Sequence, residues 1–308
     1  MQERRIQVLE ALTEGPVAGP ALADRLGVSR AAVWKHVEAL REAGFDIAGG
    51  ENGYELRSVP EFGPAVAFGL DAPVDVEYHD SIDSTNRRAR ELAARGRDGA
   101  VVVADEQTGG RGRLDRDWAP PSGGVWLSVL LRPTVPAAHA PVYTLAAAVA
   151  TTRAVREAGV EAKIKWPNDV LVGDRKLAGI LTEMEGEADR VDWLVVGIGL
   201  NANVDPGVVP AENATSLHAE CGGVDRRVLT QRLIEVLYDL HTDRDAILPA
   251  WREYADTLGR RVRVETGSRT VEGRAVDVEY PGTLDVDTGD SVVTVAAGDC
   301  EHLRPAGG

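Results

Sequence analysis

The chain has 308 residues, 44% of them hydrophobic, and its 49 acidic against 34 basic residues give a formal net charge of −15. This length indicates about two domains with room for a small third, and the composition is that of a globular protein rather than a disordered or fibrous one. The acidic balance argues against attachment to nucleic acid through bulk charge, and Cys221 and Cys300 are too few for a disulfide framework.

The first residues and the hydropathy pattern favour a cytoplasmic protein. Residues 1–15 are charged and amphipathic and lack the apolar core of a signal peptide. No stretch approaches the run of about 20 apolar residues that spans a bilayer, so we expect no membrane insertion. Four of the basic residues are lysines, namely Lys35, Lys163, Lys165 and Lys176, and this acidic, lysine-poor composition suggests a cytoplasm of high ionic strength.

Residues 1–57 are predicted to form a winged helix-turn-helix. Apolar residues at helical spacing mark a first helix, and two more follow around a hinge at Gly27–Ser29. Ser29 suits the N-cap of the third helix and Gly44 suits its end. A hairpin over 45–58 is then expected to form the wing. The third helix, which is the second helix of the helix-turn-helix motif, is the one expected to enter a major groove.

That third predicted helix is the candidate DNA-reading element. Its buried stripe leaves Ser29, Arg30, Ala31 and Lys35 exposed on the N-terminal half, where phosphates and base edges would lie. The segment carries 7 basic and 9 acidic residues and therefore lacks a strong electrostatic footprint. Two interpretations stay open: DNA binding through this helix, or a module that only mediates dimer contacts.

The rest of the chain predicts a multidomain α+β protein. A Pro/Gly-rich linker, 58–73, leads into a central domain, 74–257, whose closely spaced strands predict a mixed, largely antiparallel sheet with helices on one face. Residues 258–308 change to short alternating strands between Gly, Asp and Pro turns, which predicts a small SH3-like β-barrel with a structural or docking role. Strands are expected over 100–107, 124–133, 161–167, 169–184 and 192–204, and helices over 86–96, 141–159 and 226–244.

The stretch 105–113, DEQTGGRGR, is the first candidate for ligand binding. Its glycines allow the backbone to wrap closely around a ligand, and the guanidinium groups of Arg111 and Arg113 can each grip carboxylate or phosphate oxygens. It is neither a Walker A loop nor a Rossmann fingerprint. Alone, the stretch is also compatible with an exposed surface loop.

The stretch 165–169, KWPND, ends one predicted strand and begins a hairpin whose return strand carries Lys176. Lys165 and Lys176 would then face one sheet surface together with Asp169, a carboxylate able to take Mg²⁺. A solvated hairpin with surface lysines is the alternative interpretation. A third stretch, 196–203, fits close strand packing as well as it fits a ligand wall.

Considered together, these stretches describe a site that brings two anions together. A carboxylate that attacks the α-phosphate of ATP meets charge repulsion, which arginine, lysine and Mg²⁺ relieve. The sequence contains no HExxH or CxxC motif that would offer a competing chemistry. We therefore expect an adenylate-forming enzyme, with the identity of the acid left open.

Five blocks give the sequence a specific resemblance. In their order and spacing they are similar to the signature blocks of biotin–protein ligases. With the helix-turn-helix in front and the β segment behind, essentially the whole chain resembles the bifunctional ligases that also repress the biotin operon. The blocks are SIDSTN (81–86), EQTGGRGRLDRDW (106–118), KWPNDV (165–170), RKLAGIL (175–181) and GIGLNAN (197–203).

The resemblance implies a two-step reaction on biotin that needs ATP and Mg²⁺. Biotin and MgATP give biotinyl-5′-AMP and pyrophosphate, and the biotinyl group then passes to one lysine of a biotin carboxyl carrier protein. The resemblance also implies operator DNA as a partner and a homodimer whose formation is linked to the adenylate. Two alternatives remain: a biotin-sensing transcription factor with a vestigial ligase centre, and a lipoate–protein ligase.

The same resemblance implies a role for each motif residue. The biotin-binding residues would be Ser84, Thr85, Asn86, Gln107, Arg111, Gly112, Arg113 and Lys176, and the ATP-binding residues Arg111, Arg113, Trp118, Lys165, Asn168, Asp169 and Asn201. Lys176, Arg113 and Lys165 would be catalytic, and Asp169 would hold Mg²⁺ through ATP. One departure is Asp115, which stands where the family commonly has glycine; it is expected to alter the behaviour of the loop rather than to abolish activity.

Overall fold

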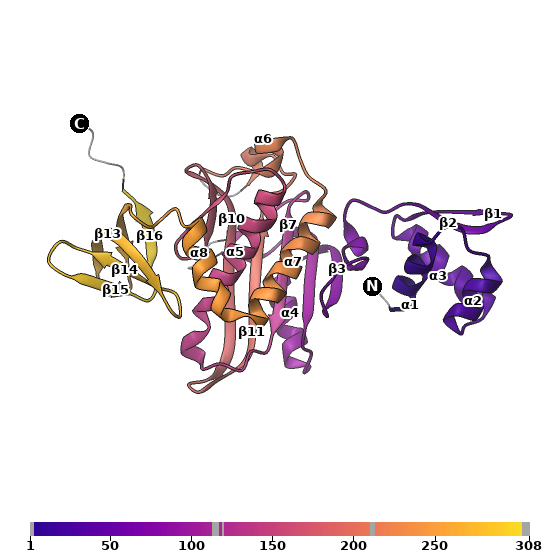
Figure 1. The fold of residues 1–308 in the computed structure, drawn as a ribbon, viewed down its shortest axis with the longest axis horizontal. Coiled ribbons are helices and arrows are strands. Elements are labelled where there is room, and N and C mark those ends of the chain that lie inside the picture. Colours follow the sequence, from indigo (N-terminus) through magenta and orange to yellow (C-terminus); the bar gives the residue numbers. More distant parts are fainter. Residues whose placement is uncertain (1–2, 113–116, 119, 210–212, 304–308) are drawn as a thin grey trace.

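The computed structural model describes residues 3–112, 117–118, 120–209 and 213–303. Figure 1 shows three parts in a row: an N-terminal helical unit, a central sheet covered by helices, and a small C-terminal sheet. They follow the order that the sequence predicts. Within the described ranges, no helix combines the length and the apolar character needed to cross a membrane.

The N-terminal part has the predicted winged helix-turn-helix architecture. Gly27 adopts a left-handed backbone at φ 63°, which ends the second helix, and the Ser29 hydroxyl accepts the Ala32 N–H at 3.2 Å, which caps the third. Leu9, Val37 and Leu40 are fully buried in the core between the helices. The elements are α1 (Glu3–Thr13), α2 (Gly19–Leu26), α3 (Arg30–Glu42), β1 (Asp46–Gly50) and β2 (Gly53–Ser58).

The central part is built on a seven-stranded mixed sheet with the strand order β3-β4-β7-β11-β10-β9-β8. The β3–β4 pair is parallel and the other neighbours are antiparallel. The sequence did not predict β3, because its residues DVEYHDSI are mostly polar. The strands are β3 (Asp75–Ile82), β4 (Ala100–Gln107), β7 (Val125–Leu131), β8 (Lys163–Lys165), β9 (Asp169–Val172), β10 (Arg175–Glu187) and β11 (Arg190–Leu200), and a separate two-stranded pair is formed by β5 (Gly110–Arg111) and β6 (Asp117–Trp118).

Helices cover both faces of this sheet, so the prediction of helices on one face is wrong. Helix α4 packs on the face that carries Val102 and Leu130, whereas α5, α7 and α8 belong to the core on the face of Val101 and Val129. In β4 every residue over 100–104 is buried. A strand that is apolar on both sides is covered on both sides. The helices are α4 (Thr85–Ala94), α5 (Pro141–Glu157), α6 (Leu217–Cys221), α7 (Arg226–Thr242) and α8 (Ile247–Tyr254), with 3-10 turns η1 (Gly63–Ala67), η3 (Ala137–His139), η4 (Pro206–Val208) and η5 (Arg244–Ala246).

The C-terminal part is a five-stranded, all-antiparallel sheet in the order β15-β14-β13-β12-β16. No pairing between β15 and β16 closes it within the described residues, so the predicted closed SH3-like barrel is not confirmed. The sheet docks on the central part, where the Trp166 indole donates to the Gly282 carbonyl at 2.9 Å. The strands are β12 (Arg261–Glu265), β13 (Thr270–Glu279), β14 (Thr283–Asp287), β15 (Val292–Val295) and β16 (Asp299–His302).

His302 lies in this contact and makes it sensitive to acid. Its side chain is only 11% exposed, and Nε2 lies 3.0 Å from the Thr257 hydroxyl. Burial, with a further contribution from the charge of Lys165, outweighs the Asp256 carboxylate 3.5 Å from Nδ1 and lowers the pKa of His302 to about 4. The unfolded chain therefore binds a proton between pH 6.5 and about 4 that the folded chain does not bind.

The unfolding free energy linked to His302 is accordingly expected to be at its maximum above pH 6.5. It should fall as the pH falls towards 4, because protonation of His302 then favours the unfolded chain. Lowering the pH from 7 to 5 should remove about 2 kcal/mol of unfolding free energy through this group. Urea unfolding at both pH values measures the loss, and His302→Gln should remove this part of it. An unchanged pH dependence in the variant would contradict the assignment.

Candidate active site

A large cavity, about 2100 Å³ in volume, lies between the central sheet and the C-terminal sheet. Most of the predicted site residues line it, although they come from four separate parts of the sequence. The N-terminus of α4 and the end of β4 supply one end, and the β8–β9 turn and the start of β10 supply another. The predicted site residues on its wall are Ser84, Thr85, Asn86, Gln107, Gly112, Lys165, Asn168, Asp169 and Lys176.

Hydrogen bonds fix the orientation of Gln107 at the α4 end. The first N–H groups of a helix have no partner within the helix. The Thr85 backbone N–H therefore donates to Gln107 Oε1 at 2.8 Å, and the Thr85 hydroxyl lies 3.2 Å from the same oxygen. A backbone N–H can only donate, so the amide oxygen of Gln107 must face Thr85. Ser84 caps the same helix by accepting the Arg87 N–H at 3.4 Å.

Ser128 supports this end of the cavity, a role that the sequence alone did not predict. It is fully buried on β7, and its hydroxyl lies 2.8 Å from the Thr85 hydroxyl and 2.5 Å from Asn86 Oδ1. Asn86 Nδ2 in turn donates to Glu183 Oε2 at 2.7 Å. The available signal was a hydroxyl inside the otherwise apolar run VWLSVLL, because a buried polar group needs a partner.

Gly197 on β11 leaves the space that the Asn86 side chain occupies. A Cβ atom at this position would lie 2.1 Å from Asn86 Oδ1 and 2.8 Å from its Cγ. The side chain of Asn86 thus lies directly against the backbone of the strand. This close approach explains why position 197 is a glycine. The sequence alone left the stretch 196–203 open between close strand packing and a ligand wall.

A bulge at the start of β10 sets the direction of Lys176. Asp169 pairs with Gly179, and Leu171 pairs with Lys176, with a register shift between 176 and 178. The shift places the side chains of Lys176 and Asp169 on one face of the sheet, where Nζ lies 2.6 Å from Asp169 Oδ1. Gly179 lies beneath this ion pair, since a Cβ there would be 3.2 Å from the Lys176 ammonium.

Lys165 and Asn168 flank this ion pair. Lys165 is opposite Asp169 in the β8–β9 pair, so the two side chains share a face. The side chain of Asn168 donates to the Ile180 carbonyl at 2.9 Å, which fastens the turn to β10. The structure therefore places two lysines and one carboxylate on one sheet surface, in line with the sequence interpretation.

Other predicted site residues are not placed on the cavity wall. Asn201 is buried and donates to the Thr215 carbonyl at 2.9 Å, and it does not line the cavity. Arg113 and Asp115 lie outside the described residues. For Arg111 and Trp118 the structure describes only the backbone of the β5–β6 pair.

Comparisons with known proteins identify the family to which the chain belongs. Residues 78–201 match the biotin/lipoate A/B protein ligase family, residues 4–55 match a helix-turn-helix domain, and residues 257–303 match the C-terminal domain of biotin protein ligases. The bifunctional ligase/repressor BirA of Bacillus subtilis is 38% identical over 303 residues, which cover 92% of this chain and 93% of that protein. The chain belongs to the biotin–protein ligase family.

Further relatives of this ligase agree. The biotin–[acetyl-CoA-carboxylase] ligase of Mycobacterium tuberculosis is 36% identical over 72% of the chain and 86% of its own length. The structure of the Aquifex aeolicus biotin protein ligase in complex with biotin and ATP superposes with a TM-score of 0.62 at 26% identity, and the match covers 75% of this chain and 99% of that one.

Within the described part of this ligase, the side chains do not form a resident metal site. The described residues contain no group of three or more His, Cys, Asp or Glu side chains arranged to hold an ion. Asp169 already has one oxygen in contact with Lys176. A Mg²⁺ ion that takes most of its ligands from phosphate and water would need few protein oxygens, and the second oxygen of Asp169 is the one available beside Lys176.

The helix-turn-helix of this ligase presents the predicted DNA-contacting residues to solvent. Ser29, the N-cap of α3, is exposed, and so are Arg30, Ala31 and Lys35 in the N-terminal half of the helix. Trp34, at 55% exposure, lies among them. The opposite face of α3 is buried against α1 and α2. The helix is thus packed in the way that leaves this face free to enter a groove.

Proposed function

We propose that the cavity activates biotin with MgATP and transfers it to a biotin carboxyl carrier protein. An oxygen of the biotin carboxylate attacks the α-phosphorus of ATP, and pyrophosphate leaves with the bonding electrons. The ε-amine of a carrier lysine then attacks the acyl carbon, loses a proton, and releases AMP. Both steps need positive charge beside the reacting oxygens and a fixed position for the acid.

The cavity residues divide between these two tasks. We assign the ureido end of biotin to Ser84, Thr85 and Gln107, whose polar atoms are already oriented. Lys176 is assigned to the carboxylate and the α-phosphate, with Asp169 holding the ammonium in place. Lys165 then contacts the phosphates, which repel each other until cations approach.

The remaining site assignments rest on the motifs. We propose that Arg111 and Arg113 bind the adenylate phosphate from either side of Gly112, and that Asp169 contacts Mg²⁺ only through bound ATP. Trp118 is proposed to stack on the adenine ring. Asn168 and Asn201 are proposed to act on the ATP side by fixing the backbone that borders the nucleotide.

The observation that supports this function best is the Lys176–Asp169 ion pair, which shares one cavity with the oriented Gln107. Incubation with labelled biotin, MgATP and a biotin carboxyl carrier domain, at low and at high salt, tests it. Label is expected on the carrier, and a carrier whose acceptor lysine is replaced by arginine should stay unlabelled. If biotin binds but label reaches neither carrier at either salt, the ligase assignment is contradicted.

We further propose that the protein is a biotin-responsive repressor. Adenylate binding is proposed to favour a homodimer, which presents two α3 helices to palindromic operator half-sites. An activity that consumes ATP and acts on operator DNA would operate in the cytoplasm.

Duplexes selected from a random-sequence pool in the presence of biotin and MgATP should accordingly be palindromic. Arg30→Ala and Lys35→Ala should each weaken binding and lower the salt slope by about one, because each removes one phosphate contact. Both variants should ligate biotin normally. Selection of non-palindromic duplexes would contradict the proposed dimer. Full DNA affinity in a variant that carries both Arg30→Ala and Lys35→Ala would contradict the proposed DNA-binding face of α3.

A further inference from the structure

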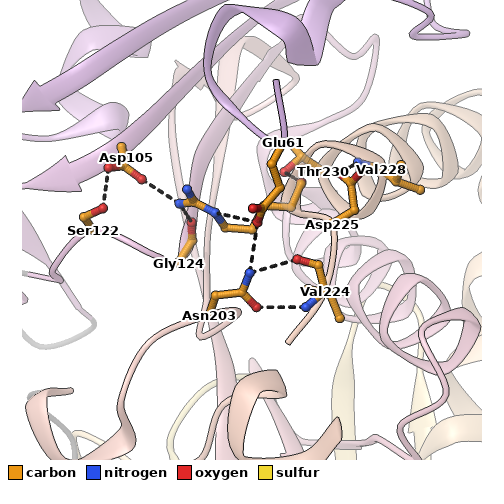
Figure 2. Close-up of polar contacts among 10 residues, drawn as sticks. Glu61, Asp105, Ser122, Gly124, Asn203, Val224, Asp225, Val228 and Thr230 are labelled. Atoms are coloured by element: carbon orange, nitrogen blue, oxygen red, sulfur yellow. Dashed lines mark hydrogen bonds and ion pairs between the residues drawn. The ribbon is translucent and has the colours of Figure 1, made fainter. Parts of the chain in front are cut away.

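Arg226 occupies a junction between three parts of the chain. It begins helix α7, and its side chain is only 15% exposed. One guanidinium nitrogen lies 2.6 Å from Asp105 Oδ1 and 3.3 Å from the Gly124 carbonyl. Figure 2 shows this group of polar contacts, in which Asp105, Gly124 and Glu61 surround the guanidinium.

Asp105 connects the junction to the biotin end of the cavity. It stands on β4 two residues before Gln107. Its second oxygen accepts the Ser122 hydroxyl, and its backbone carbonyl accepts the Trp126 indole N–H at 3.1 Å. Burial acts to raise the pKa of Asp105, but hydrogen bonds from Ser122 and Arg226 outweigh it and hold the pKa below its usual value. The carboxylate is therefore charged when it meets Arg226.

Glu61 and Phe62 connect the same junction to the linker that follows the wing. The Arg226 guanidinium lies 4.2 Å from the centre of the Phe62 ring, and its Nε is 3.9 Å from Glu61 Oε1. The Glu61 backbone carbonyl accepts the Arg227 N–H at 2.8 Å. Its side chain accepts a hydrogen bond from Asn203 Nδ2 at 3.1 Å (Figure 2). The linker is thus fastened at the point where it reaches the central domain.

A guanidinium suits these two partners at once. Its planar group stacks on an aromatic ring while its edge donates to a carboxylate, which a lysine ammonium does not reproduce. A pair this deeply placed is costly to break, because each half would leave a poorly solvated charge. The Arg226 guanidinium therefore joins β4, through Asp105, to the linker, through Phe62.

We propose that Arg226 is a positioning residue that couples the winged-helix linker to the Gln107 end of β4. Occupation of the biotin cavity then stabilises the Asp105–Arg226 contact and with it the linker, and a fixed linker favours ligand binding to the same degree. This coupling rests on the proposed binding of biotin beside Gln107. It adds a route by which the cavity reports its state to the DNA-binding domain.

Hydrogen exchange on the full-length protein, with and without biotin and MgATP, tests the coupling. In the wild-type protein the ligands should slow exchange in residues 84–107 and also in the linker, 58–73. Arg226→Gln should abolish the linker response and raise the KM for biotin about tenfold, with a smaller effect on kcat. Arg226→Lys should not restore the response.

Two further variants separate coupling from loss of folding. Arg232→Gln removes a surface ion pair of the same helix, 2.7 Å from Glu157, and should leave both responses intact. Glu61→Ala alters a side chain that is 60% exposed, and should weaken the linker response and raise the KM for biotin by less than Arg226→Gln does.

The outcomes that overturn the proposal are distinct. Protection of residues 84–107 without any change in the wild-type linker contradicts the coupling alone. A linker response that survives in Arg226→Gln does the same. No protection in either segment contradicts the proposed biotin site and the coupling with it.

Discussion

Replacing Lys176 with alanine is expected to slow adenylate formation by about 10²–10³-fold, the usual effect of losing one group that stabilises charge in a transition state. The ammonium is held 2.6 Å from Asp169 on the cavity wall, over Gly179, and its backbone is fixed by hydrogen bonds to residues 213 and 215. Because the position is set before substrate binds, the alanine variant loses a positive charge from a fixed place on the cavity wall. Rapid-mixing measurement of pyrophosphate release reports this step directly.

Lys163 provides the matched control. It is also a lysine of the central sheet, but its side chain is exposed and does not line the cavity. Lys163→Ala should therefore form adenylate at the wild-type rate. Lys176→Arg retains the charge in a wider, planar group and should recover only part of the rate. If Lys176→Ala formed adenylate at the wild-type rate, Lys176 would not be the group that activates biotin and ATP.

A methyl group at position 197 is expected to disrupt the biotin end of the cavity. In Gly197→Ala the new Cβ would stand 2.1 Å from Asn86 Oδ1, so Asn86 must move and give up its contacts with Ser128 and Glu183. Overpacking of this kind costs about 1–3 kcal/mol of stability. We also expect the KM for biotin to rise by roughly tenfold or more, since one such factor corresponds to about 1.4 kcal/mol of binding free energy.

A double variant identifies the cause of that loss. Asn86→Ala removes the atoms that collide, so Gly197→Ala combined with Asn86→Ala should be more stable than the sum of the two single effects predicts. Thermal unfolding and biotin titration of the four proteins complete the cycle. Strictly additive effects would show that the two residues do not meet.

Local patterns predicted the winged helix-turn-helix well, and also the hairpin that follows Lys165. Ser29 and Gly44 were recognised from their chemistry, because a hydroxyl at an N-cap and a glycine after a helix each satisfy a backbone requirement that depends on a few neighbouring residues. The turn after Lys165 was recognised in the same way. The blocks around Gln107 and Lys176 identified the family without any knowledge of their spatial arrangement.

Features that depend on distant parts of the chain were missed. The helices on both faces follow from burial of the whole of β4, which a short apolar run indicates only indirectly. Ser128 gained meaning only when Thr85 and Asn86, more than forty positions away, were placed beside it. Arg226 and Asp105 lie 121 positions apart, and nothing in either local sequence indicates the other.

Isolation of the bound product without a carrier tests the central claim most directly. The protein would be incubated with biotin and MgATP alone, separated from free nucleotide, denatured, and analysed by mass spectrometry. We predict biotinyl-5′-AMP in an amount close to one per chain, with an equal release of pyrophosphate. Recovery of unchanged biotin and ATP, or of ADP and phosphate in place of pyrophosphate, would contradict an adenylate-forming cavity.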